Sequence, residues 1–192
     1  CGDLMLQRFK AGDHIVCGEN LYGGVFRLFD KLLGNFGLTF SWVDTRDPQR
    51  IEDAMTPATR LVFVETPTNP LMRICDLRAA ADVAHAHDAL LLVDNTFASP
   101  FFQRPFEFGA DIIYHSTTKY LNGHSDMIGG IAILKTHAAV TSASSGRSAT
   151  SHIIVLHVWL KTPRGWETIA RQATKASPVP GRSFADLEAP GQ

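Results

Sequence analysis

The strongest constraint on the fold is an alternation, from residue 13 to about residue 134, of short apolar runs with longer amphipathic stretches. Such alternation is typical of repeated βαβ units, in which helices connect buried parallel strands and cover the sheet. We therefore predict an α/β fold with a mostly parallel sheet and flanking helices. The runs that predict strands are His14–Cys17, Leu38–Val43, Arg60–Glu65, Leu90–Asp94, Asp111–His115 and Met127–Leu134.

Three stretches between these strands are predicted to be helices. Residues 25–33 carry Phe and Leu at near-helical spacing. Asp47 and the proline after it open a second helix that runs to Met55, because Asp caps free N–H groups and Pro suits the first turn. Asp76 caps a third, alanine-rich helix that ends near His87.

The composition indicates a globular protein that acts on small molecules. Hydrophobic residues make up 45% of the chain and the formal net charge is -1, so no basic field for nucleic acid exists. No apolar run is long enough to cross a membrane, and no signal peptide is visible. The three cysteines, Cys1, Cys17 and Cys75, form no Cys-x-x-Cys pair, which favours a reducing compartment. We predict a cytoplasmic protein without nucleic-acid or membrane partners.

The sequence changes character near residue 137. Residues 1–137 hold 12 Lys+Arg and 16 Asp+Glu, whereas residues 138–192 hold 6 and 3. The stretch 141–151 contains five serines and is not expected to order itself, although 153–160 is apolar enough for a strand. We predict a partial large domain at 1–137 and an atypical Ser/Pro/Arg-rich tail at 138–192, explained by a frameshift or by disorder.

The chain starts at Cys1 rather than at a methionine, and we expect it to be part of a longer protein. If part of the large domain is missing, apolar strands such as Leu90–Val93 are expected to lie partly open.

The segment Ser116-Thr117-Thr118-Lys119 follows a predicted strand, at a place where parallel sheets bind ligands. A lysine amine there can hold an aldehyde cofactor as a Schiff base, and the hydroxyls of Ser116 and Thr118 can donate to a phosphate. The alternative is a surface lysine beside an ordinary Ser/Thr turn.

Asp94 ends the apolar strand Leu90–Asp94, 25 positions before Lys119. A buried carboxylate needs a cationic partner, and a protonated pyridine nitrogen of a cofactor is one. The alternative is an aspartate that caps a helix or holds a turn.

Four segments carry a family resemblance. They are Tyr22–Phe29, Glu65–Pro70, Val93–Thr96 and Ser116–Asp126. In this order and at these separations they resemble the Cys/Met-metabolism family of enzymes that depend on pyridoxal 5'-phosphate, which includes cystathionine γ-synthase and γ-lyase. The resemblance covers about residues 9–134 and implies the large domain of fold-type I (aspartate aminotransferase-like) enzymes, shortened at both ends.

The resemblance also implies roles for single residues. Lys119 would form the Schiff base, Asp94 would pair with the ring nitrogen, and Ser116 and Thr118 would hold the phosphate. Asn69 would approach the ring hydroxyl, and a cis bond at one of the two Pro peptides near it would fit that aim. Tyr22 would stack on the ring and pass a proton through its hydroxyl. Arg27 matches a family arginine near the far end of the substrate, with a solvated charge as the alternative.

The implied function is γ-elimination or γ-replacement on cystathionine or an O-acylhomoserine, in a homo-oligomer, a tetramer in the full-length family. The resemblance does not separate γ-synthase, γ-lyase, sulfhydrylase and methionine γ-lyase. A non-catalytic fragment or pseudogene product is a second hypothesis. A dinucleotide-binding domain is excluded because no Gly-x-Gly-x-x-Gly follows a strand. The eight histidines show no metal-ligand spacing, so no metal is expected.

Overall fold

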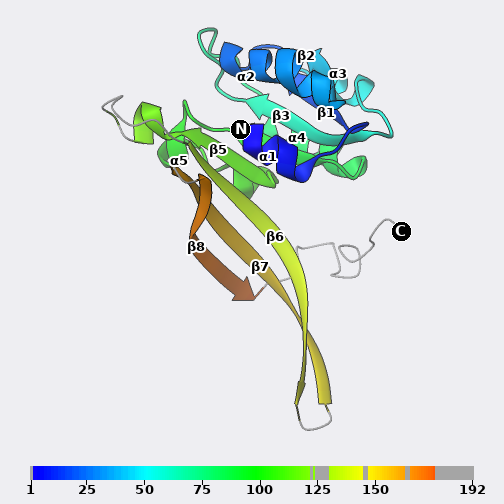
Figure 1. Ribbon diagram of the computed structural model, residues 1–192, viewed down its shortest axis with the longest axis vertical. Coiled ribbons are helices and arrows are strands. Elements are labelled where there is room, and N and C mark those ends of the chain that lie inside the picture. Colours follow the sequence, from blue (N-terminus) through cyan, green and yellow to red (C-terminus); the bar gives the residue numbers. More distant parts are fainter. Residues whose placement is uncertain (1, 122, 124–129, 145–146, 163–164, 176–192) are drawn as a thin grey trace.

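The computed structural model describes residues 2–121, 123, 130–144, 147–162 and 165–175. Within these residues one eight-stranded sheet has the order β2-β1-β3-β4-β5-β6-β7-β8 (Figure 1). The first five strands in this order are mutually parallel, so the predicted α/β fold with a mostly parallel sheet is confirmed. These strands are β1 (His14–Gly18), β2 (Thr39–Val43), β3 (Thr59–Glu65), β4 (Leu90–Asp94) and β5 (Ile112–Ser116).

The helices largely follow the predicted pattern. The predicted helix at 25–33 is found as three successive helical segments of different pitch, which end at Gly37 with φ +83°. Asp47 and Asp76 cap their helices as predicted, since they accept the N–H groups of Gln49 at 3.0 Å and Ala79 at 3.1 Å. None of the helices in the described part of the chain has the length and apolar character of a membrane span. The helical elements are α1 (Gly2–Arg8), α2 (Gly23–Arg27), η1 (Leu28–Leu32), η2 (Leu33–Phe36), α3 (Pro48–Asp53), α4 (Leu77–Ala86), α5 (Ser99–Phe102), η3 (Pro105–Phe108) and η4 (Thr117–Leu121).

Helices cover both faces of the parallel sheet. Alternate strand residues point to opposite faces, so each face contributes its own set of side chains to the packing. On one face the strands pack against α3 and α4 through Val16, Val62, Val64, Leu91 and Val93. On the other face they pack against α1, α2, η1 and η2 through Ile15, Cys17, Leu61, Phe63, Leu92 and Ile112. The expectation that β4 lies partly open is therefore wrong for Leu91, Leu92 and Val93, which are fully buried.

The antiparallel strands beyond β5 differ from the sequence prediction. β6 (Gly130–Ser144), β7 (Arg147–Thr162) and β8 (Gly165–Lys175) form a meander that extends away from the parallel strands (Figure 1). Of the predicted strand at 127–134, residues 127–129 lie outside the described residues. β6 and β7 pair as far as Ser144 and Arg147, inside the serine-rich stretch that was expected to lack order. Backbone pairing explains the difference, since it satisfies N–H and C=O groups whatever the side chains are. The division at residue 137 falls within β6 and stays a prediction.

Candidate active site

Four neighbouring parallel strands end at the edge of the sheet that carries the predicted site residues. Tyr22 lies four residues after β1, and Glu65, Asp94 and Ser116 are the last residues of β3, β4 and β5. Because β1, β3, β4 and β5 are consecutive in the sheet and parallel, their carboxyl ends share one edge (Figure 1). Ligands bind at this edge in open α/β sheets.

Asp94 is buried at this edge, with 7% of its surface exposed. Burial raises the pKa of its carboxyl above the ordinary value, and hydrogen bonds from Thr96 partly offset that effect. The Thr96 backbone N–H donates to Asp94 Oδ1 at 3.0 Å and its hydroxyl donates to the same oxygen at 2.5 Å. Asp94 therefore holds a turn, as one alternative proposed, but it does not cap α5, whose N-cap residue is Ala98.

Thr96 also connects Asp94 to the strand that leads into the lysine segment. Its hydroxyl oxygen accepts the backbone N–H of Ser116 at 2.9 Å. This contact joins the end of β4 to the end of β5 and fixes Ser116 relative to the carboxylate. Sequence reasoning did not single out Thr96, because a threonine two residues after an aspartate is an ordinary turn residue.

Lys119 lies in η4, which directly follows β5, as the sequence predicted. The backbone there is not regular helix, since Lys119 has φ -91° and ψ -125°. Lys119 is exposed, whereas Ser116 and Thr118 are half-buried. Thr117 is buried, and its hydroxyl has no hydrogen-bond partner among the described residues. Of the resembling segment that continues to residue 126, residues 122 and 124–126 lie outside the described residues.

Glu65 is a second residue that sequence reasoning did not single out. Its carboxylate is buried and accepts the backbone N–H of Tyr22 at 2.9 Å and of Asn69 at 3.2 Å. Burial and the neighbouring Asp94 raise the pKa of Glu65 to about 7, against the lowering effect of the two N–H groups. Glu65 thus ties together the two loops that carry Tyr22 and Asn69.

The side chains of these loops face solvent in the chain as described. Tyr22 is 63% exposed, and its ring covers Gly24, where a Cβ atom would lie 2.5 Å from Tyr22 Cε1. Glycine at position 24 therefore leaves room for the ring. Asn69 is exposed, and Arg27 is exposed in the last turn of α2.

A network of amide groups supports the loop that carries Asn69. Asn95 is fully buried, and its side chain donates to the Gln103 carbonyl at 2.9 Å. The Gln103 side chain donates back to Asn95 Oδ1 at 2.9 Å and to the Thr66 carbonyl at 3.0 Å. Both X-Pro bonds of the loop, Thr66-Pro67 and Asn69-Pro70, are cis, where the sequence suggested one.

Two histidines, one in α4 and one directly after it, have protein partners. His85 Nε2 lies 2.9 Å from Asp111 Oδ2, and His87 Nε2 lies 2.8 Å from Glu52 Oε1. Each pair joins α4 to another part of the chain, so these side chains have structural roles. No group of three or more potential metal ligands occurs among the residues that the structure describes.

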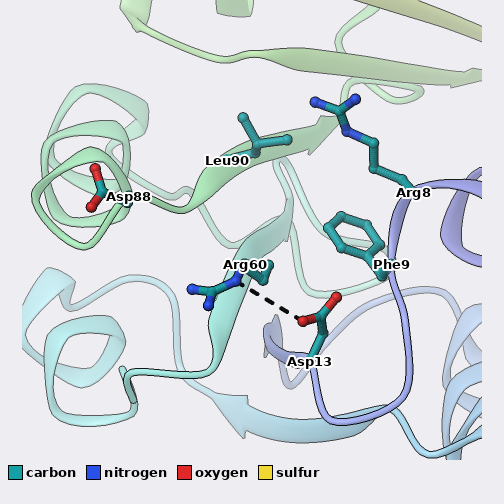
Figure 2. Close-up of a pocket in the computed structure, with 6 residues that line it drawn as sticks. All are labelled: Arg8, Phe9, Asp13, Arg60, Asp88 and Leu90. Carbon is teal, nitrogen blue, oxygen red and sulfur yellow. Dashed lines mark ion pairs between the residues drawn. The ribbon is translucent and has the colours of Figure 1, made fainter. Parts of the chain in front are cut away.

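A cleft of about 350 Å³ lies at the opposite edge of the sheet (Figure 2). Its lining includes Asp13, just before β1, Arg60 near the start of β3 and Leu90 at the start of β4. Arg60 Nε lies 4.0 Å from Asp13 Oδ1 across this cleft. These residues mark the amino ends of the strands, so the cleft is separate from the candidate active site.

The fold and this site define an α/β protein with a lysine and a buried carboxylate at the carboxyl edge of its sheet. The family model for the Cys/Met metabolism PLP-dependent enzymes matches residues 2–178. The chain belongs to this family, which depends on pyridoxal 5'-phosphate. The match extends past residue 137, where the sequence changes its charge balance.

Curated relatives agree with this assignment. The chain is 50% identical over 127 residues to a probable cystathionine γ-synthase of Herpetosiphon aurantiacus, an alignment that covers 66% of this chain and 40% of that protein. It is 46% identical over 129 residues to a cystathionine γ-lyase of Bacillus subtilis, with coverage of 67% and 34%. It is 48% identical over 128 residues to an L-methionine γ-lyase of Treponema denticola, with coverage of 66% and 32%.

A solved structure shows the same fold. The cystathionine γ-lyase of Lactobacillus plantarum, crystallised with L-serine, superimposes with a TM-score of 0.67 at 52% identity. That match covers 70% of this chain and 35% of the other. The chain thus spans between about a third and two-fifths of the length of the relatives it matches.

Proposed function

We propose that this chain supplies the cofactor-binding core of a PLP-dependent transsulfuration enzyme that acts on cystathionine or an O-acylhomoserine. One observation carries the proposal. Thr96 bonds both the buried carboxylate of Asp94 and the backbone of Ser116, three residues before Lys119. Thr96 thus connects Asp94, which could pair with a cationic cofactor ring, to the segment that carries the Lys119 amine. The names of the relatives supply the substrate class.

The residues present fit the chemistry of pyridoxal 5'-phosphate. Asp94 is a buried carboxylate at the strand end, and a cation beside it would offset the cost of its burial. The hydroxyls of Ser116 and Thr118 lie in the same segment as Lys119 and are suited to a phosphate. The buried hydroxyl of Thr117, which has no partner among the described residues, adds a donor to this segment.

Each side chain then has a defined task. When bound, the cofactor supplies a conjugated ring that takes up negative charge from the substrate. Lys119 would hold the aldehyde through its amine and would move a proton at its Nζ atom. Asp94 would keep the ring nitrogen protonated. Tyr22 would exclude water from the ring and move a proton at its hydroxyl, and Asn69 would bind the ring hydroxyl.

The proposal concerns a class of reaction rather than one reaction. Relatives named γ-synthase, γ-lyase and methionine γ-lyase, and a cystathionine β-lyase of Lactococcus lactis, match at 46–50% identity over similar lengths. The segment they share with this chain therefore does not distinguish them. Arg27 is proposed to approach the far end of the substrate, as the family resemblance implies.

The deciding experiment is reduction of a cofactor adduct. The purified chain is mixed with pyridoxal 5'-phosphate, its visible spectrum is recorded, and borohydride is added before peptide mapping. We expect the reduced adduct on Lys119, and we expect it to vanish in Lys119→Ala. Lys31→Ala is the matched control, because Lys31 is an exposed lysine paired with Asp30. Equal labelling of wild type and Lys119→Ala would overturn the proposal.

Self-association is proposed as part of this function, and exposed aromatic side chains support it. Phe101 and Phe102 in α5 are 85% and 82% exposed. Large exposed apolar side chains commonly mark contact surfaces. Light scattering tests this, with a dimer or larger species expected for the wild type and a smaller one for the double variant Phe101→Ser, Phe102→Ser. A monomeric wild type would contradict self-association.

A further inference from the structure

Glu65 occupies a position between the two loops that flank the candidate cofactor site. One carboxylate oxygen, Oε2, accepts the N–H of Tyr22, and the other, Oε1, accepts the N–H of Asn69. Tyr22 is 43 residues away in sequence and Asn69 is four residues away. Each oxygen of this buried carboxylate accepts a hydrogen bond from a different loop, so Glu65 fixes the distance between the Tyr22 and Asn69 loops.

We propose that Glu65 is a positioning residue that clamps the Tyr22 and Asn69 loops together, and that its ionisation is coupled to the charge at Asp94. The predicted effect of a bound cofactor on Glu65 rests on the proposed function. The clamp and the coupling are properties of the chain alone and can be measured without the cofactor.

The groups around Glu65 define its electrostatics. Asp94 lies beside it, since the two residues are register partners at the ends of β3 and β4. Tyr114 is the next register partner, on β5, and Asp94 raises its pKa in addition to the effect of burial. Glu19, on the loop after β1, is paired with Arg73 at 2.7 Å. Asp94 is therefore the neighbouring charge that acts on Glu65.

These surroundings leave Glu65 divided between two protonation states near neutral pH. Burial, together with the negative charge of Asp94, raises its pKa to about 7. A cation placed beside Asp94 would offset that negative charge and so favour the ionised form of Glu65. The proton released by Glu65 would pass to solvent. The ionised form binds the two N–H groups more strongly, because charge-assisted hydrogen bonds are the stronger kind.

The coupling links ligand binding at Asp94 to the strength of the hydrogen bonds between Glu65 and the two loops. A ligand cation at Asp94 would favour ionised Glu65 and so strengthen its hydrogen bonds to the Tyr22 and Asn69 loops. Reciprocity requires that protonation of Glu65 weaken the binding of the same cation. A bound ring nitrogen would thereby strengthen the two loop contacts that Glu65 already makes in the chain alone.

The test follows the backbone amides of Tyr22 and Asn69 by NMR during a pH titration of the cofactor-free chain. In the wild type both amides should shift with one common midpoint near pH 7. Glu65→Gln, a near-isosteric change, should abolish that midpoint. Asp94→Asn removes the neighbouring charge and should lower the midpoint by about one pH unit. Glu19→Gln, a carboxylate on the same loop as Tyr22, is the matched control and should leave the midpoint unchanged.

Each result decides one part of the proposal. Different midpoints for Tyr22 and Asn69, or a midpoint that persists in Glu65→Gln, would overturn the clamp. An unchanged midpoint in Asp94→Asn would overturn the coupling. Titration of the wild type with pyridoxal 5'-phosphate then tests the proposed function separately, since failure to form an adduct leaves the amide titrations intact.

Discussion

Thr96 bonds the Asp94 carboxylate twice, through its backbone N–H at 3.0 Å and through its hydroxyl at 2.5 Å. Both bonds go to Oδ1 of the carboxylate, and Thr96 makes none to Oδ2. The hydroxyl oxygen at the same time accepts the N–H of Ser116. A single side chain thus orients the carboxylate and joins it to β5.

Replacing Thr96 by valine tests this connection between Asp94 and β5. Valine keeps the shape and the backbone N–H but loses the hydroxyl, so one bond to Asp94 and the partner of the Ser116 N–H disappear. We expect a loss of about 1–3 kcal/mol in the free energy of unfolding, because two hydrogen bonds are lost and the N–H of half-buried Ser116 is left without its partner. Denaturant titration measures it. Thr39→Val is the control, since it removes one hydroxyl bond, to the Asp13 carbonyl at 3.3 Å, from an exposed residue on an edge strand. A loss as large there would argue against a special role for Thr96.

Local sequence signals predicted much of the fold but not the hydrogen bonds between residues far apart in the sequence. The strand that ends at Asp94 and the helix that Asp76 caps follow from apolar runs and capping chemistry within a few residues. The bond between Thr96 and Ser116 joins residues 20 positions apart, and Glu65 reaches Tyr22 across 43 positions. Such contacts exist only once the strand order is set, and no local pattern encodes that order.

Two other differences have the same physical origin. Helix α1 was not predicted, and it is anchored by Met5, which is fully buried against the sheet. Its stability thus depends on tertiary packing rather than on a local signal. β6 and β7 were not predicted through the serine-rich stretch because pairing of two strands depends on both partners at once.

Asp76→Ala tests the capping assignment. Asp76 Oδ1 accepts the N–H of Ala79 at 3.1 Å, and its loss leaves that donor at the start of α4 without its cap. We expect a loss of about 1 kcal/mol in the free energy of unfolding. Asp82→Ala is the matched control, because Asp82 is exposed in the interior of the same helix, away from its N-cap. Equal effects of the two substitutions would contradict the cap.

The described cysteines are expected to resist alkylation in the folded chain. Cys17 is fully buried, and burial raises the pKa of its thiol well above the ordinary value. Burial also raises the pKa of Cys75 to about 12. Because the thiolate is the reactive form, iodoacetamide at pH 8 should leave both residues unlabelled until denaturant is added. Mass spectrometry of peptides measures this, and rapid labelling of Cys17 before unfolding would contradict its place in the core.

Two buried groups affect stability in opposite directions as the pH changes. Burial lowers the pKa of His115 to about 4, from an ordinary value of 6.5, so the unfolded chain binds more protons between these values. Stability from His115 is therefore present above pH 6.5 and is lost as the pH falls toward 4. The raised pKa of Glu65, about 7 against 4.5, has the reverse effect, since its stability is present below pH 4.5 and is lost as the pH rises toward 7.

These opposing effects overlap between pH 4.5 and 6.5, and we expect the wild-type free energy of unfolding to vary little there. His14, whose pKa burial lowers, adds to the His115 effect, while Asp94, whose pKa burial raises, adds to that of Glu65. Glu65→Gln should make stability rise with pH in this window, and His115→Gln should make it fall, each by roughly 2 kcal/mol. Denaturant titrations at pH 4.5, 5.5 and 6.5 measure the three slopes. If both variants changed the slope in the same direction, at least one of the two residues would not be buried as described.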